Sequence, residues 1–255
     1  MTKQEIFKFL EKTITIGEQL YEDNYYDTIA EPLINIKSPF NFSLDNGATK
    51  VVILIKGADF VIKIPFTGFY SDDAQDDYIY KLSEQHKDMP ESELQDLIDK
   101  IDYGQFILPF ENARFYSEDK NQHLNCWDYC ALETEVYTLA VERGLEQYFA
   151  AEEFIGEIDN HPIYAQQRAI PFDSFYETTP IDKERSTRTK ARCEELDIWC
   201  FDPIWIADFF DAYGEEEFKR LNAFLDEYEI GDIRRANIGY REGLPILFDY
   251  AGYHD

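Results

Sequence analysis

The chain has 255 residues, of which 52 are acidic and 24 are basic, so its formal net charge is −28 at neutral pH. Hydrophobic residues at 44% and aromatic residues at 16% exclude a disordered chain and predict a folded protein with a large core. The negative charge disfavours nonspecific binding to nucleic acids and to anionic membranes. The sequence shows neither a signal-peptide profile nor an apolar run of membrane-spanning length, so we expect a cytoplasmic protein.

The first 40 residues are expected to form a helical extension. Residues 2–20 have the pattern of an amphipathic helix, in which Thr2 and Glu5 can form a capping box. The apolar residues that share one face of this helix are Ile6, Phe9, Leu10 and Ile14. This face predicts a packing role, and we assign the helix no other function.

Two strands are predicted next, at residues 50–55 and 60–65. The second strand places Lys63 among β-branched residues, where an ammonium group is costly unless it reaches a partner. A lysine on an edge strand that points into solvent is the alternative. The preceding turn contains Gly47 and Thr49, whose backbone N–H groups and hydroxyl could contact a phosphate. A plain hairpin turn explains the same residues.

Residues 66–124 form an acidic insertion. Within it we expect a helix from about residue 88 to 101 and a strand at 106–110. Four carboxylates gather near its start, at Asp72, Asp73, Asp76 and Asp77. Such a cluster is usually a solvated face, but it also makes the insertion the best candidate for a partner-binding surface.

A strong helix is predicted from residue 128 to about 143, with Asp128 as its cap and Gly144 at its end. Glu133 lies four residues before Tyr137, a spacing that resembles the kinase helix whose glutamate pairs with the strand lysine. This resemblance makes Glu133 the first choice as the partner of Lys63, and Glu135 the second. An exposed helical glutamate is the alternative for either residue.

The second half of the chain first predicts two strands, at 149–157 and 163–169, and the latter contains Gln166 and Gln167. Asp202 and Pro203 then begin a helix that Gly214 ends. The next helix carries an apolar stripe with helical spacing, formed by Phe218, Leu221, Leu225 and Tyr228.

The last motif is a loop followed by a hairpin. Residues 238–240 and 246–248 are short apolar strands around a turn that contains a glycine. This geometry puts Asp232 and Asn237 on one side of the hairpin and Asp249 just past its end. Two carboxylates and a carboxamide would then converge, and such an oxygen-rich group suits a hard cation such as Mg²⁺.

These segments together resemble the protein-kinase-like superfamily. The strand Phe60-Val61-Ile62-Lys63-Ile64-Pro65 resembles the lysine strand of kinases, and Asp-x-x-x-x-Asn followed by Asp-Tyr-Ala-Gly resembles their catalytic and metal-binding loops. The Gly231-Asp232 pair is closer to aminoglycoside and choline kinases than to protein kinases. The resemblance implies an α+β, two-lobed fold. Residues 41–169 would form an N-lobe with an antiparallel sheet and one helix, and residues 170–255 a mainly helical C-lobe.

The resemblance also implies roles for individual residues. Asp232 would orient or deprotonate the accepting hydroxyl, and Arg234 would offset charge on the transferred phosphoryl group. Asn237 and Asp249 would hold magnesium. ATP would be the second cofactor. Lys63 would hold its phosphates, and Glu133 would fix Lys63 in position. The remaining nucleotide contacts would come from Gly47 and Thr49 near the phosphates and from Gln166 and Gln167 near the adenine.

The chain also departs from the family pattern. The phosphate loop has one glycine rather than three, Ile230 stands where the catalytic motif has a histidine, and the sequence stops three residues after Gly252. Peptide recognition in the manner of protein kinases is therefore not expected. Compact kinase-like proteins of bacteriophages are similar in shortness and acidity, which suggests a phage protein in the host cytoplasm.

Three functions follow as hypotheses. The first is a Mg·ATP-dependent phosphotransferase that acts on a host protein or a small molecule. The second is a weakly catalytic pseudokinase that acts by binding a protein partner through its acidic surface. The third is an acidic, DNA-mimic-like inhibitor of a host nucleic-acid-binding protein. None of the three requires direct binding to nucleic acid or membrane.

Overall fold

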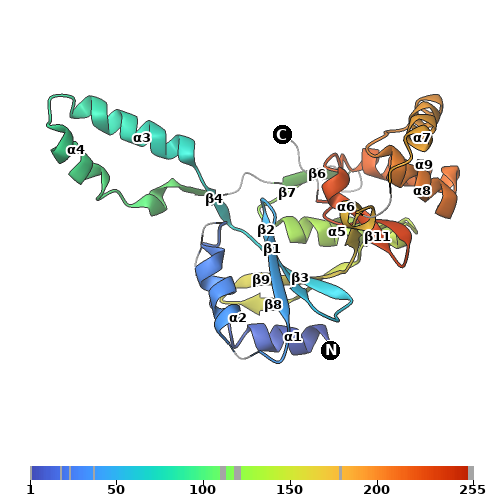
Figure 1. Ribbon diagram of the computed structural model, residues 1–255, viewed down its shortest axis with the longest axis horizontal. Coiled ribbons are helices and arrows are strands. Elements are labelled where there is room, and N and C mark those ends of the chain that lie inside the picture. Colours follow the sequence, from blue (N-terminus) through green and yellow to red (C-terminus); the bar gives the residue numbers. More distant parts are fainter. Residues whose placement is uncertain are drawn as a thin grey trace.

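The protein has an α+β architecture in which an antiparallel sheet is followed by a mainly helical region (Figure 1). A computed structural model describes residues 2–17, 19–22, 24–36, 38–109, 113–117, 122–177 and 180–251. Among these residues, no helix is both long enough and apolar enough to cross a membrane.

The main sheet has five antiparallel strands in the order β1-β2-β3-β9-β8. The two predicted hairpin strands are confirmed, with Val52 opposite Lys63. The β8–β9 turn consists of Asp159 and Asn160, both with positive φ, which is the turn chemistry that matches the twist of paired strands. The strand bounds are β1 (Phe42–Asn46), β2 (Lys50–Ile55), β3 (Phe60–Pro65), β8 (Glu152–Ile158) and β9 (His161–Gln167).

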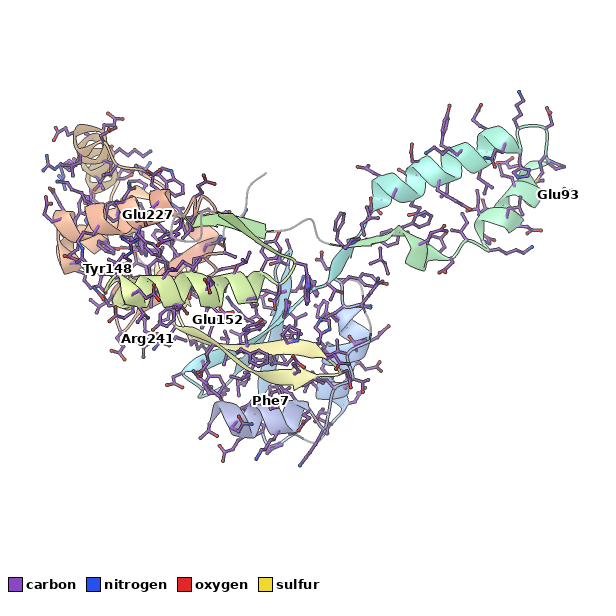
Figure 2. All side chains as sticks on the ribbon, turned by 180° about the vertical axis from the view of Figure 1, so that it is seen from behind. Phe7, Glu93, Tyr148, Glu152, Glu227 and Arg241 are labelled. Carbon is purple, nitrogen blue, oxygen red and sulfur yellow. The ribbon has the colours of Figure 1, made fainter. Side chains whose placement is uncertain are left out.

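One face of this sheet is covered by the N-terminal helices. The three short helices are α1 (Lys3–Leu10), η1 (Tyr26–Ala30) and α2 (Glu31–Asn35). Phe7 of α1 packs so closely on β8 that a Cβ on Gly156 would lie 2.4 Å from its ring (Figure 2). The shared core of helices and sheet includes Ile6, Leu10, Ile14, Leu33, Val51, Ile53, Ile55, Ile62 and Ile64.

The expected capping box of the first helix is present, since the backbone N–H of Glu5 donates to Thr2 Oγ1 and that of Thr2 to Glu5 Oε2. The expected length is wrong, because the helix ends at Leu10 rather than near residue 20. The chain leaves the helix to bond with the sheet region. The Ile16 N–H donates to the Asp159 carboxylate at 2.9 Å.

The opposite face of the sheet carries α5 (Tyr129–Glu142). As predicted, Asp128 caps this helix, with its Oδ1 accepting from the Ala131 N–H at 2.9 Å, and Gly144 with positive φ follows its end. The Tyr164 hydroxyl of β9 donates to the other Asp128 oxygen at 2.5 Å, which ties the start of the helix to the sheet. A hairpin of β6 (Ala113–Ser117) and β7 (Gln122–Cys126) precedes the helix.

Residues 68–109 of the acidic insertion project from the sheet as an arm (Figure 1), whereas its later strand β6 pairs with β7 next to α5. The base of the arm is the pair β4 (Gly68–Tyr70) and β5 (Ile107–Pro109), and its length consists of α3 (Asp72–Gln85), α4 (Glu91–Ile98) and η2 (Tyr103–Phe106). The predicted helix is α4, shorter than expected, and the predicted strand is β5, whose expected last residue Phe110 lies outside the described residues. The sequence reading missed α3, which Ser71 caps and which carries the four clustered aspartates.

The C-terminal region is built around buried aromatic residues. Its elements are η3 (Glu146–Tyr148), β10 (Ile170–Pro171), α6 (Phe172–Phe175), α7 (Lys183–Leu196), α8 (Pro203–Tyr213), α9 (Glu215–Glu227), η4 (Arg235–Asn237), β11 (Ile238–Arg241) and β12 (Leu244–Leu247). The predicted ends of α8, the stripe of α9 and the final hairpin are confirmed. A second core joins these elements to α5 and includes Val136, Trp205, Phe209, Phe218, Leu221, Leu225 and Tyr228.

Candidate functional site

The expected lysine–glutamate pair is present. Lys63 lies on β3 and Glu133 on α5, and the Lys63 ammonium contacts Glu133 Oε2. The Glu133 side chain is fully buried, because α5 lies against the sheet face from which Lys63 points. Both alternatives for these residues, a lysine and a glutamate in solvent, are therefore wrong. The cap at Asp128 fixes the first turn of α5. It thereby helps to hold Glu133, which lies about one turn further along the helix.

A second buried lysine, which sequence reasoning missed, joins this pair. The Lys50 ammonium contacts both Glu133 Oε1 and Asp249 Oδ1. Lys50 is the first residue of β2, and Val52 on the same face of that strand lies opposite Lys63. The side-chain period of two puts both lysines on the same face of the sheet. The four residues that separate the two predicted strands would have given this register from the sequence.

A third strand completes the buried cluster. Glu152, at the start of β8, lies between α5 and the sheet (Figure 2) and accepts from the Lys63 ammonium at 3.1 Å. The Gln166 side chain donates to Glu152 Oε2 at 2.7 Å and to Glu133 Oε2 at 3.2 Å. Glu152 Oε1 is buried and has no hydrogen-bond partner among the described residues. No pattern in the sequence points to Glu152, because its role depends on how three strands and a helix meet.

We define the buried ion cluster as Lys50, Lys63, Glu133 and Glu152. Burial alone lowers the pKa of both lysines, but the carboxylates outweigh it and raise each pKa above its ordinary value. Asp249 and Glu133 act on Lys50, and Glu133 and Glu152 on Lys63. The four groups carry two positive and two negative charges, so the cluster is neutral. Pairing of this kind lets charges stay ionised away from water.

The loop after α9 brings Asp232 and Asn237 together, as the sequence predicted. Asn237 is buried, and its Nδ2 donates to the backbone oxygen of Asp232 at 2.7 Å and to its Oδ2 at 3.2 Å. Both bonds use the amide nitrogen, so the amide oxygen is the Asn237 atom that could bind a cation. The Asp232 side chain is 29% exposed, and Arg234 Nε lies 3.2 Å from its Oδ1.

A buried aspartate anchors this loop to the helices. Asp202 Oδ1 caps α8 by accepting from two backbone N–H groups, and its Oδ2 accepts from Arg235 Nη2 at 2.8 Å. The Arg235 guanidinium also lies over the Phe172 ring, 4.7 Å from its centre. Trp205 Nε1 donates to the Gly239 carbonyl at 3.0 Å, which fixes the strand after the loop. The segment that follows Asp232 is thus held in place by Asp202, Phe172 and Trp205.

Asp249 links the loop to the buried ion cluster. It directly follows the final hairpin and has a positive φ of 57°, a conformation that aspartate tolerates better than most residues. The Phe248 N–H donates to the Asn237 carbonyl at 3.0 Å, so the hairpin brings Asp249 toward the loop. Burial raises the pKa of Asp232; the Arg234 charge lowers that pKa and the Asp249 charge raises it, so both charges act on the Asp232 carboxyl.

The donor set suits a magnesium ion better than a soft metal. No group of three or more histidine, cysteine, aspartate or glutamate side chains converges in the described part of the chain. Asp249 supplies a carboxylate oxygen and Asn237 an amide oxygen, and the Asp232 carboxylate lies beside Asn237. Mg²⁺ is commonly bound by one or two carboxylates and completes its shell with water and phosphate oxygens. The Asp249 side chain is 41% exposed, so solvent reaches this end of the cluster.

The other sequence-predicted contacts lie around this centre, and one of them, Gln166, joins it. Gly47 and Thr49 occupy the β1–β2 turn directly before Lys50, and the Gly47 N–H donates to the Lys50 carbonyl at 3.0 Å. Gln166 contributes its side chain to the ion cluster, whereas its expected place was near the adenine. Gln167 instead lines a depression of 340 Å³ together with Tyr137, Glu146, Gln147, Phe149, Tyr213, Arg241, Glu242, Leu244, Pro245 and Ile246.

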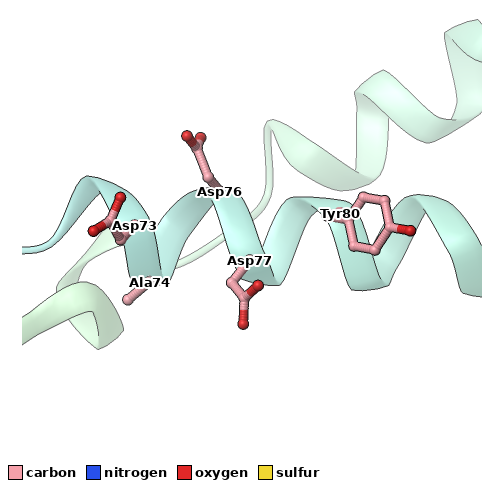
Figure 3. A pocket seen from close by; sticks show the side chains of 5 residues that line it. All are labelled: Asp73, Ala74, Asp76, Asp77 and Tyr80. Carbon is pink, nitrogen blue, oxygen red and sulfur yellow. The ribbon is translucent and has the colours of Figure 1, made fainter.

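A separate depression lies on the arm. Its lining residues are Asp73, Ala74, Asp76, Asp77 and Tyr80, all from one side of α3 (Figure 3). Because a single helix supplies them, these side chains point outward and do not converge on a common point. The chemistry of the molecule is therefore concentrated at the buried ion cluster and the Asp232 loop.

No protein-family model matches the chain, and no curated protein matches its sequence. Function must therefore be inferred from the geometry. The arrangement places two ammonium groups, two carboxylates that solvent reaches and an amide oxygen at one end of a sheet. Such a combination can neutralise a polyphosphate, bind a hard cation and accept a proton.

Proposed function

We propose that this protein is a Mg·ATP-dependent phosphotransferase with a two-lobed, kinase-like fold. The observation that carries the proposal is the link from the Lys63–Glu133 pair through Lys50 to Asp249. In protein kinases a strand lysine pairs with a helix glutamate near a metal-binding aspartate, and the phosphates bind there. The sheet with its N-terminal helices would be one lobe, and residues 170–251 the other.

The order of elements supports the same proposal. The lysine strand, the glutamate helix, two further strands, the striped helix and the Asp-Asn loop follow one another along the chain. The two hydrophobic cores support two lobes, with α5 packed against the helical region. Asp128 and Asp202 each cap a helix next to the site. In each lobe, a buried aspartate at the start of a helix would therefore help to hold the functional residues in place.

In the proposed reaction the hydroxyl oxygen of the acceptor bonds to the γ-phosphorus, and the bond from that phosphorus to the β–γ bridging oxygen breaks. ADP leaves with that electron pair, and Asp232 accepts the hydroxyl proton. Arg234, beside Asp232, offsets negative charge on the transferred group. Bound Mg²⁺ would neutralise the phosphates, held by Asn237 and Asp249. A host protein or a small molecule supplies the hydroxyl.

Calorimetric titration with ATP, with and without magnesium, tests this proposal. We expect magnesium-dependent binding that weakens at least about tenfold in Asp249→Ala, a loss of about 1.4 kcal/mol. Asp232→Ala should still bind Mg·ATP but lose transfer of labelled γ-phosphate, because it removes the proton acceptor and not the metal ligand. ATP binding in neither condition would contradict the proposal.

The arm supports a second candidate function, that of a protein that binds a basic partner. No residue of α3 or α4 is buried, and the exposed Tyr78 and Tyr80 follow the four clustered aspartates along α3. A pseudokinase or a DNA-mimic-like inhibitor would act through this surface. Under this function Asp232→Ala would leave the biological activity unchanged, and neutralising the four clustered aspartates would abolish it.

A further inference from the structure

A kinase-like site needs one strand lysine that pairs with one helix glutamate. The buried ion cluster contains a second lysine. Both ammonium groups are buried to a similar extent, with side-chain exposures of 2% for Lys50 and 4% for Lys63. Exposure therefore does not show which of the two lysines would contact a nucleotide. The groups that each ammonium contacts do show it.

Lys63 has partners that cannot leave. Its ammonium contacts Glu133 and Glu152, whose side chains are both fully buried, and Gln166 donates to both carboxylates as well. A ligand that displaced either glutamate would leave a carboxylate unpaired in the protein interior, which is strongly unfavourable. A phosphate would therefore have to displace a buried glutamate in order to contact the Lys63 ammonium.

Lys50 has one fixed partner and one that can leave. Glu133 is buried, but Asp249 is 41% exposed and lies outside the neutral cluster of two lysines and two glutamates. Withdrawal of Asp249 therefore leaves the buried charges balanced. It also frees one of the three N–H donors of the Lys50 ammonium. Lys50 directly follows Thr49, so the same short segment also supplies a hydroxyl.

We propose that Lys50, rather than Lys63, is the lysine that binds the nucleotide phosphates, and that its ion pair with Asp249 closes the site when no metal is bound. This inference rests on the proposed function. When Asp249 binds the cation, its charge is shared with the metal and its hold on Lys50 weakens. Glu133 keeps the Lys50 ammonium in position, and a phosphate oxygen takes the place of Asp249. Lys63 is then a positioning residue that orients Glu133.

Matched double variants test the assignment without leaving an unbalanced buried charge. The unmodified protein is the reference, and Lys50→Met and Lys63→Met are each combined with Glu152→Gln, so that one lysine and one glutamate remain in each double variant. The readouts are the affinities for Mg·ATP and for adenosine, which lacks phosphates. Urea unfolding establishes that each variant is folded.

We expect Lys50→Met with Glu152→Gln to bind Mg·ATP at least about tenfold more weakly than the reference, with adenosine affinity unchanged. Lys63→Met with Glu152→Gln should stay within about threefold of the reference for both ligands. Equal losses in the two double variants, a loss confined to the Lys63 variant, or a parallel loss of adenosine would each overturn the assignment. Failure of the unmodified protein to bind Mg·ATP would overturn the proposed function and the assignment with it.

A metal-free titration tests the closing ion pair separately. With magnesium removed by a chelator, Asp249→Ala should bind ATP more tightly than the unmodified protein, because Lys50 is no longer engaged. With magnesium present the order should reverse. Asp232→Ala is the control for the loss of one negative charge at a carboxylate that does not contact Lys50. An equal gain in both variants without magnesium would show that the Lys50–Asp249 pair does not close the site.

Discussion

The buried ion cluster and the arm use the same residue types in opposite ways. In the cluster, Glu133 is fully buried and each of its oxygens contacts a lysine. On the arm, Asp77 pairs with Lys81 one helical turn away, but both side chains are about two-thirds exposed. Water replaces the partner of an exposed charge, so such pairs contribute little. A buried charge has no such replacement, and its removal affects the whole fold.

The largest effect is expected from Glu133→Gln. The substitution leaves two buried lysines with only Glu152 as a buried carboxylate, and removing one partner of a buried pair typically costs about 3–5 kcal/mol. Urea unfolding should show this loss of stability. Glu142→Gln is the matched control, since Glu142 is exposed on the same helix and should change stability by less than about 0.5 kcal/mol. Similar stabilities for the two variants would contradict the comparison.

An intermediate effect is expected from Asp202→Ala. The change removes the cap of α8 and leaves Arg235 without its carboxylate, which together cost about 2–4 kcal/mol. Asp182→Ala removes the cap of α7 at an exposed position and should cost about 1 kcal/mol. Thermal unfolding of both variants measures the difference. An equal cost would mean that burial of the cap does not matter.

The smallest effect is expected when the arm is removed. The Ser71 N–H donates to the Phe106 carbonyl at 3.0 Å, so a linker of about four residues can replace residues 72–105. Because neither α3 nor α4 has a buried residue, the free energy of unfolding should change by less than about 1 kcal/mol. Affinity for Mg·ATP should also stay the same. A loss above about 3 kcal/mol would show that the arm packs on the rest of the protein.

Local patterns allowed much of this structure to be predicted from the sequence. The hairpin that carries Lys63, the capped helix that carries Glu133 and the loop with Asp232 and Asn237 each depend on residues close together in the chain. Turn chemistry and helix caps determine such elements largely without their surroundings.

The features that were missed depend on contacts between distant segments or on competing local signals. Lys50 gains its role because α5 and the final hairpin bring Glu133 and Asp249 to its ammonium, and Glu152 because β8 joins the sheet beside β9. The first helix ends early because Ile16 bonds to a turn that lies far along the chain. Helix α3 was missed because its aspartates have low helix propensity, although those in its first turn favour the helix dipole.

The contact between Lys50 and Asp249 joins residues that are 199 positions apart. A ribosome that adds 5–20 residues per second needs about 10–40 s to synthesise the chain between them. During that time the sheet and α5 can already pair both lysines with both glutamates, because that group is neutral without Asp249. The last contact then forms as a late step. A nascent chain would thus carry a stable sheet well before it could bind a metal ion.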